Sequence, residues 1–116
     1  MKIYISMVGL LASLTFANTS FAGPGESCHF HGSKAAPESV ILKCADLRKQ
    51  SLIKSGKLDK SWELIKHSSI DLVDGKKSKE WKVVFKNSAI QDKTKVNLYM
   101  FFTPPGNFIA TNHTGQ

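Results

Sequence analysis

Between Pro37 and Gly56 the apolar positions recur with the 3.6-residue period of an α-helix. Pro suits the first turn of a helix, Glu38 suits its positive end, and Gly56 is a typical stop. One broad face is apolar, made of Val40, Ile41, Cys44, Ala45, Leu47 and Leu52. The opposite face carries Lys43, Asp46, Gln50 and Lys54. The pattern predicts an amphipathic helix lying on a core.

Arg48 lies within the apolar stripe of this predicted helix, where an apolar residue is expected. One interpretation is that the Arg48 side chain extends outward from the edge of the stripe to solvent, or pairs with Glu80 or Asp92. The other is an anion site beneath the helix.

After Gly56 the pattern changes to the two-residue alternation of β-strands. Trp62 is predicted to be a core anchor, and the segment 64–65 fits either a helical turn or a strand. Strands are predicted at residues 68–73, 81–86, 96–102 and 108–113, with turns at 74–79 and 104–107 and a polar loop at 87–94. Pro105-Gly106 favours a type II turn.

A helix followed by a run of strands predicts an α+β fold, with one amphipathic helix packed on a three- to four-stranded antiparallel sheet. The helix is expected to cover Trp81, Val83, Phe85, Val96, Leu98, Met100 and Phe102. The other face then presents Lys82, Val84, Lys86, Tyr99 and Phe101. Exposed aromatics among lysines would form a partner-binding surface, unless the arm, a loop or a second copy covers them.

The amino-terminal residues have the features of a cleavable export signal. Lys2 precedes a short apolar run, and the small residues at Ser20 and Ala22 fit a cleavage site. The run is too short and too interrupted for a membrane span, which needs about 20 apolar residues. We therefore expect a signal peptide at 1–22, an extended arm at 23–36 and a single domain at 37–116, in a periplasmic or secreted protein.

The chain has a net charge of +7, and Arg48 is its only arginine. Arginine is the usual residue for bidentate recognition of phosphates and bases. A surface charged by lysine favours solubility and general attraction to anions. Together with export, this composition argues against nucleic acid as a partner.

Cys28 and Cys44 are the two cysteines, and an even number in an exported chain favours a disulfide. The alternative is a pair of free thiols that bind metal. Cys28-His29-Phe30-His31 contains ligands that suit copper or zinc. In an extended chain the two histidines point to one side, and Cys28 and Phe30 to the other. His113, His67 and Glu26 are candidates for further ligands.

Four segments resemble a family of small exported bacterial proteins of unknown function. They are Gly56–Asp59 with Ser61-Trp62, Glu80–Asn87, Leu98–Phe102 and Phe108–Gly115. The resemblance covers most of residues 37–115 and implies export and a compact domain, with no catalytic residues to transfer. The layout is similar to PepSY-type domains. Some members carry histidine-rich segments, whereas this arm has only Cys28, His29 and His31, and His113 replaces an expected aromatic residue.

No phosphate-binding loop, nucleophile elbow or zinc-protease motif is present in the sequence. We therefore expect a non-enzymatic binding protein. The leading hypothesis is transition-metal binding, with copper or zinc, through Cys28, His29, His31, Cys44 and His113. The alternative is a protein-interaction or inhibitor module for an envelope partner, using Lys82, Lys86, Tyr99 and Phe101.

Overall fold

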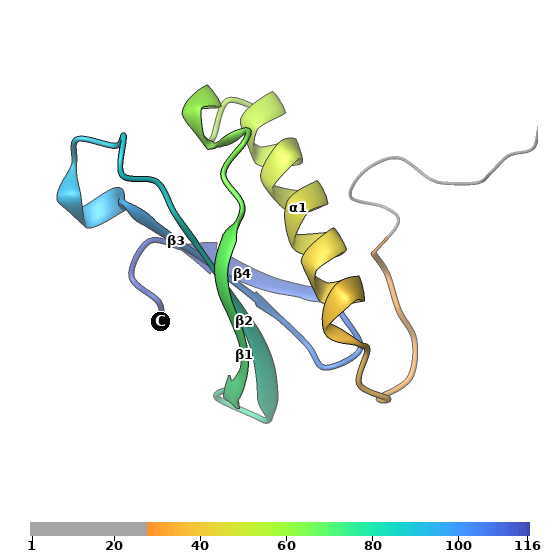
Figure 1. Cartoon of the computed structure of the whole chain (residues 1–116). Helices are drawn as coiled ribbons and strands as arrows, with labels where there is room; N and C mark the ends of the chain where they lie inside the picture. Colours follow the sequence, from red (N-terminus) through yellow and green to blue (C-terminus); the bar gives the residue numbers. More distant parts are fainter. Residues whose placement is uncertain (1–27) are drawn as a thin grey trace, which may run out of the picture.

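A computed structural model describes residues 28–116 as one helix packed on one sheet (Figure 1). The elements are α1 (Glu38–Lys54), β1 (His67–Asp74), β2 (Lys79–Lys86), β3 (Asn97–Phe102) and β4 (Phe108–Asn112). Short 3-10 turns occur at Lys60–Trp62 and Lys93–Lys95. The predicted α+β class is confirmed. The expected signal peptide lies outside the described residues.

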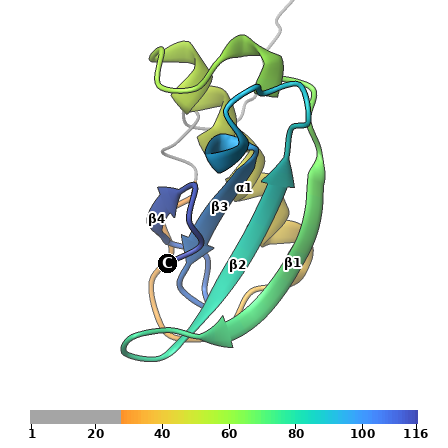
Figure 2. The same cartoon turned by 90° about the vertical axis from the view of Figure 1, so that its left-hand side faces the viewer.

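The four strands form an antiparallel meander in the order β1-β2-β3-β4. Figure 2 views the sheet with α1 behind it. Residues opposite one another in neighbouring strands share a face, and Trp81, Val83 and Phe85 pair with Phe102, Met100 and Leu98. These six side chains are buried on the side of α1, as the alternation predicts.

The core lies between α1 and that sheet face. Ile41 and Ala45 of α1 are fully buried, and the predicted anchor Trp62 is only 2% exposed. Each large apolar side chain buried here contributes about 1.5–3 kcal/mol relative to an exposed one. Trp81 also donates its indole N–H to the carbonyl of Pro104, 3.1 Å away. That bond connects β2 to the turn between β3 and β4.

Both ends of α1 follow from local sequence. The helix begins at Glu38. Pro37 is therefore its N-cap residue, with extended backbone angles, and not the first helical residue as expected. At the other end Gly56 has φ +82°, and the amides of Gly56 and Lys57 donate to the carbonyls of Ile53 and Leu52. These two bonds form a Schellman motif, which requires the left-handed conformation that glycine adopts easily.

Three local predictions differ from the structure. The tight turn after β3 has its hydrogen bond from the Gly106 amide to the Thr103 carbonyl, so the turn spans Thr103–Gly106. Gly106 is thus its fourth residue, not the third residue of a type II turn, and it has φ +117°. The last strand ends at Asn112, which leaves His113 beyond it. The segment 64–65 is neither helix nor strand.

Within residues 28–116 no helix has the length and apolar character needed to cross a membrane.

Candidate functional site

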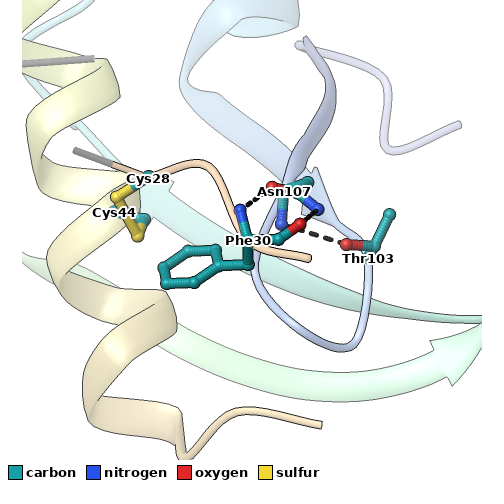
Figure 3. Close-up of a disulfide and its surroundings, with 5 residues drawn as sticks. All are labelled: Cys28, Phe30, Cys44, Thr103 and Asn107. Carbon is teal, nitrogen blue, oxygen red and sulfur yellow. Dashed lines mark hydrogen bonds between the residues drawn. A yellow bond between two sulfur atoms is a disulfide. The ribbon is translucent and has the colours of Figure 1, made fainter. Parts of the chain in front are cut away.

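A disulfide anchors the amino-terminal arm to α1 (Figure 3). It joins Cys28 to Cys44, whose Cα atoms are 5.8 Å apart, and Cys44 is almost fully buried. Because Cys44 lies on the apolar face of the helix, the bond draws the arm onto the core. The predicted pairing is confirmed, and neither sulfur is a free thiolate in this structure.

Asn107 clamps the arm at a second point. Its side-chain amide donates to the Phe30 carbonyl at 2.8 Å, and its side-chain oxygen accepts from the Phe30 amide at 2.7 Å. The two bonds satisfy the backbone of one residue as a neighbouring strand would. Thr103 holds Asn107 in place, since the Thr103 hydroxyl accepts a hydrogen bond from the backbone N–H of Asn107 at 3.0 Å (Figure 3).

The turn between β3 and β4 is shaped to receive Phe30. A Cβ atom at Gly106 would lie 2.9 Å from the Phe30 ring, closer than side chains approach one another. Further along the arm, the Ala36 amide donates to the Pro104 carbonyl at 2.9 Å. Phe30 therefore packs inward beside the disulfide, as the alternation of the arm predicts.

His29 and His31 lie together on the outside of the arm. Both side chains are exposed, and their ring centroids are 4.9 Å apart in an edge-to-face arrangement. The clamp holds the intervening residue Phe30, so the backbone that connects the two imidazoles is fixed. A pair of neighbouring imidazoles offers two nitrogen ligands of the type that copper and zinc prefer.

The other predicted ligands lie elsewhere. His113 donates from Nδ1 to the Asn97 carbonyl at 2.8 Å, and its ring is 6.3 Å from that of Trp62. Asn107 and His113 flank opposite ends of β4, which places His113 roughly 20 Å from the arm. His67 is exposed at the start of β1, and Glu26 lies outside the described residues.

Consequently no group of three or more histidine, cysteine or acidic side chains is positioned to hold a metal ion anywhere in residues 28–116. The structure brings His29 and His31 together and leaves His113 apart from them.

The outer face of the sheet carries the predicted residues, and its aromatic rings are partly or almost fully covered. Tyr99 and Phe101 pair with Val84 and Lys82 on the side away from α1. Phe101 is only 7% exposed, and Tyr99 is half-buried. Gly115 covers part of the Tyr99 ring, since a Cβ atom added to Gly115 would lie 3.3 Å from it. Of the two alternatives for this face, coverage holds for Phe101, and Tyr99 is partly covered.

The two lysines predicted for this face have different surroundings. The Lys82 ammonium lies 5.4 Å from the centroid of the Tyr99 ring, a cation–π contact. Lys86 is exposed at the far end of β2, opposite Asn97.

Arg48 stacks on an aromatic ring. Its guanidinium carbon is 3.9 Å from the centroid of the Phe108 ring, and its side chain is half-buried. This position fits the interpretation that the side chain extends from the edge of the apolar stripe. The pairing with Glu80 or Asp92 that was offered beside it is absent, since the ion pairs of the described segment are Lys49–Asp46 and Lys79–Asp74. A planar guanidinium stacks well on a ring, so the contact stabilises Arg48 at the edge of the core without a carboxylate.

Lys49 is the buried cation that the sequence interpretation missed. Its side chain is 1% exposed, and Nζ donates to the carbonyls of Ile65 and Glu63 while Asp46 Oδ1 lies 3.7 Å away. Burial lowers its pKa, and the charge of Asp46 opposes that shift. A signal existed, because Lys49 follows Ile41 and Ala45 at successive four-residue steps along the buried face.

Comparisons with known proteins place this chain in a family without assigning it an activity. The model of a family of unknown function (DUF6488) matches residues 1–116. Neither the comparison with curated proteins nor that with solved structures finds a match.

Proposed function

The chain belongs to the DUF6488 family of unknown function, and we propose that it is an exported, non-enzymatic binding protein that takes up a transition-metal ion on its amino-terminal arm. The observation that carries the proposal is the His29–His31 pair, exposed and with ring centroids 4.9 Å apart. Export would place this pair where extracellular ions reach it, and it would keep the Cys28–Cys44 bond oxidised.

The fixed backbone of the arm supports binding by a small ligand set. Ordering two imidazoles costs conformational entropy. The disulfide and the Asn107 clamp already order the arm backbone in the free protein, so less entropy is lost when an ion binds. Solvent or backbone groups complete the coordination sphere, because the described residues supply only two histidine ligands here. We therefore expect micromolar affinity.

Copper(II) is the preferred ion for such a site. Imidazole nitrogen suits both copper and zinc, and at a given nitrogen site copper(II) binds more tightly than zinc(II). With the disulfide intact, Cys28 and Cys44 are not ligands. Copper(I), which favours thiolates, is expected to bind measurably only after the bond is reduced.

Titration calorimetry of the purified protein tests the proposal. We expect copper(II) to bind with a dissociation constant of about 10 μM or lower, and zinc(II) to bind more weakly. The double variant His29→Ala/His31→Ala is expected to lose the signal. His67→Ala is the matched control, because it removes one exposed imidazole that lies on β1 and not on the arm.

Two results would contradict the metal proposal. One is the absence of copper binding tighter than about 10 μM. The other is unchanged binding in the double variant.

A titration of copper(I) into the reduced protein distinguishes a thiolate site, in which Cys28→Ser would abolish binding and His67→Ala would not.

The alternative, a protein-interaction module on the outer sheet face, receives less support from the geometry. Its premise is contact area from exposed Tyr99 and Phe101, and Phe101 is nearly inaccessible. Tyr99 lies diagonally between Lys82 and Lys86 on this face, and it is itself half-buried, so the face offers two lysines with little exposed aromatic area.

A further inference from the structure

Two connecting segments, 57–66 and 86–96, lie at the end of the molecule away from the turn between β1 and β2 (Figure 2). The first leads from α1 to β1, and the second leads from the last residue of β2 to β3. Asn87 joins them, since its side-chain amide donates to the Ser61 hydroxyl at 3.0 Å and its backbone N–H donates to the Val96 carbonyl at 2.9 Å. The segments therefore lie side by side, and we call the surface that they form the basic end.

The basic end has twice as many lysines as carboxylates. Its three carboxylates are Asp59, Glu63 and Asp92, and Asp59 and Asp92 accept hydrogen bonds from Ser61 and Thr94. Neither ion pair found within residues 28–116 includes a lysine of this end. The opposite end, made of segments 28–38 and 74–80, has four lysines against three carboxylates, so the positive charge is concentrated at the basic end. The six lysines of the basic end are all exposed: Lys57, Lys60, Lys66, Lys86, Lys93 and Lys95.

Leu64 exposes an apolar side chain at this end. It is 88% exposed, whereas the next most exposed large apolar side chain of the described residues is 45% exposed. The backbone on both sides of Leu64 is held from within, because Lys49 donates to the carbonyls of Glu63 and Ile65. Asp46, which lines the same pocket as Leu64, faces the Lys49 ammonium at 3.7 Å. The fold therefore holds Leu64 out into solvent, in a segment that also carries three of the exposed lysines.

We propose that the basic end binds the surface of an anionic lipid bilayer, with its lysines against the headgroups and Leu64 inserted at the boundary of the acyl chains. Each lysine close to such a surface is attracted by its negative potential, and an apolar side chain that reaches the acyl boundary leaves water. Lysine suits this role, because a layer of headgroups presents spread charge and not the fixed geometry that a bidentate arginine matches. An acidic polymer would attract the same lysines but would offer Leu64 no apolar surroundings.

Co-sedimentation with lipid vesicles tests the proposal, with the purified protein that begins at Gly23. We expect binding to vesicles of phosphatidylglycerol and phosphatidylcholine in equal amounts, and little binding to phosphatidylcholine alone. Raising the salt from about 0.05 M to about 0.5 M should release the protein, because salt screens exposed charges.

Two triple variants with the same change in charge locate the binding surface. Lys57→Gln/Lys60→Gln/Lys66→Gln is expected to weaken vesicle binding at least about tenfold. The matched control removes three exposed lysines from the opposite end, and it should weaken binding less than about threefold, through the net charge alone. The control variant is Lys34→Gln/Lys76→Gln/Lys77→Gln.

Variants of Leu64 test its insertion. Leu64→Ser should weaken vesicle binding about tenfold, because the inserted apolar side chain is lost. Ile109→Ser is the matched control and should bind as the wild type does, since Ile109 is also exposed, at 42%, but lies on a bulge of β4 outside the basic end. In Leu64→Trp, vesicles should shift the emission of the added tryptophan to shorter wavelength, and brominated acyl chains should quench it.

Four results would overturn the proposal. They are equal binding to phosphatidylcholine alone, equal losses in the two triple variants, no binding at about 1 mM accessible anionic lipid, and unchanged binding of Leu64→Ser. The last result would assign the basic end to an acidic polymer that attracts the lysines alone. His29→Ala/His31→Ala is expected to bind vesicles as the wild type does, so a failure of the metal proposal is distinguishable from a failure of this one.

Discussion

Two neighbouring cations of α1, Arg48 and Lys49, face inward and find different partners. Arg48 stacks on Phe108 at the edge of the core, whereas Lys49 extends beneath the segment that follows Trp62. Lys49 donates to the Ile65 carbonyl and lies 5.1 Å from the Phe85 ring centroid. Its role is to satisfy backbone carbonyls of a segment that belongs to neither helix nor strand.

Lys49→Met is therefore expected to destabilise the protein. The substitution keeps the apolar stem and removes the donor to Ile65 and Glu63, which costs about 1–3 kcal/mol of unfolding free energy. Urea denaturation measures the loss, with Lys43→Met as the control because Lys43 is exposed on the same helix. Unchanged or increased stability of Lys49→Met would show that these carbonyls are satisfied without the ammonium.

The same pair of proteins tests the pKa of Lys49. Burial lowers this pKa in the folded state below its ordinary value of 10.5. Between the lowered value and 10.5 the unfolded chain binds more protons, so raising the pH favours the folded state. The stability advantage of the wild type over Lys49→Met should widen as the pH rises toward 10.5, and a constant or shrinking difference would contradict the assigned direction.

At the scale of elements, the arm is held in place by contacts and not by regular secondary structure. Residues 28–36 form neither helix nor strand, yet Cys28, Phe30 and Ala36 all pack against the core. The turn Thr103–Gly106 and the following Asn107 form the surface on which they lie. The arm and this turn thus depend on each other.

Asn107→Ala removes both hydrogen bonds to Phe30 and tests this dependence. We expect the unfolding free energy to fall by about 1–3 kcal/mol, with loss of hydrogen-exchange protection at the Phe30 amide. Asn107→Asp keeps an acceptor for that amide, so it should retain part of the protection. Gln91→Ala, in an exposed loop, serves as the control. Full protection of the Phe30 amide in Asn107→Ala would mean that the disulfide alone positions the arm.

At the scale of the whole molecule, the fold is a single sheet with its helix on one face only. The core face is covered by α1 (Figures 1 and 2). On the outer face a groove is lined by residues of the β4 bulge and of the turn after β1. The arm attaches at the turn Thr103–Gly106, and none of the described arm residues lines the groove.

Export remains a prediction, and it belongs to the whole molecule. We expect the protein to be recovered from the cell envelope or medium as about 94 residues beginning at Gly23. Intact mass spectrometry should find a mass lower by two hydrogen atoms than that of the reduced chain, and thiol titration in denaturant should find no reactive group. An unprocessed chain in the cell interior with two free thiols would contradict export.

Much of the fold was accessible from the sequence because its signals are local. The alternation at residues 81–86 and 98–102 correctly assigned both sheet faces, since successive side chains of a strand point to opposite sides. Val96, expected under the helix, precedes β3 and is only partly buried. The disulfide was also accessible, because Cys44 lies on the buried face of α1 and Cys28 shares the inward side of the arm with Phe30. The same alternation placed His29 beside His31.

The failures concern contacts between distant segments. For Arg48 the sequence left open an outward extension, a carboxylate partner or an anion site, and it did not indicate the stacking on Phe108 of the distant strand β4. Lys49 was overlooked because its acceptors belong to a segment without regular structure. The exposure of Phe101 and the position of His113 depend on where the chain runs after β4, which periodicity does not report.

By itself, the sequence determined the order of the elements, the two faces of the sheet and the partners of the disulfide, because period, cysteine pairing and turn residues act over a few positions. Only the tertiary structure decided that Lys49 is buried, that Asn107 clamps the arm and that a bulge in β4 leaves Ile109 exposed. The physical reason is that burial and hydrogen-bond satisfaction are properties of the packed chain, in which residues up to 77 positions apart share one contact.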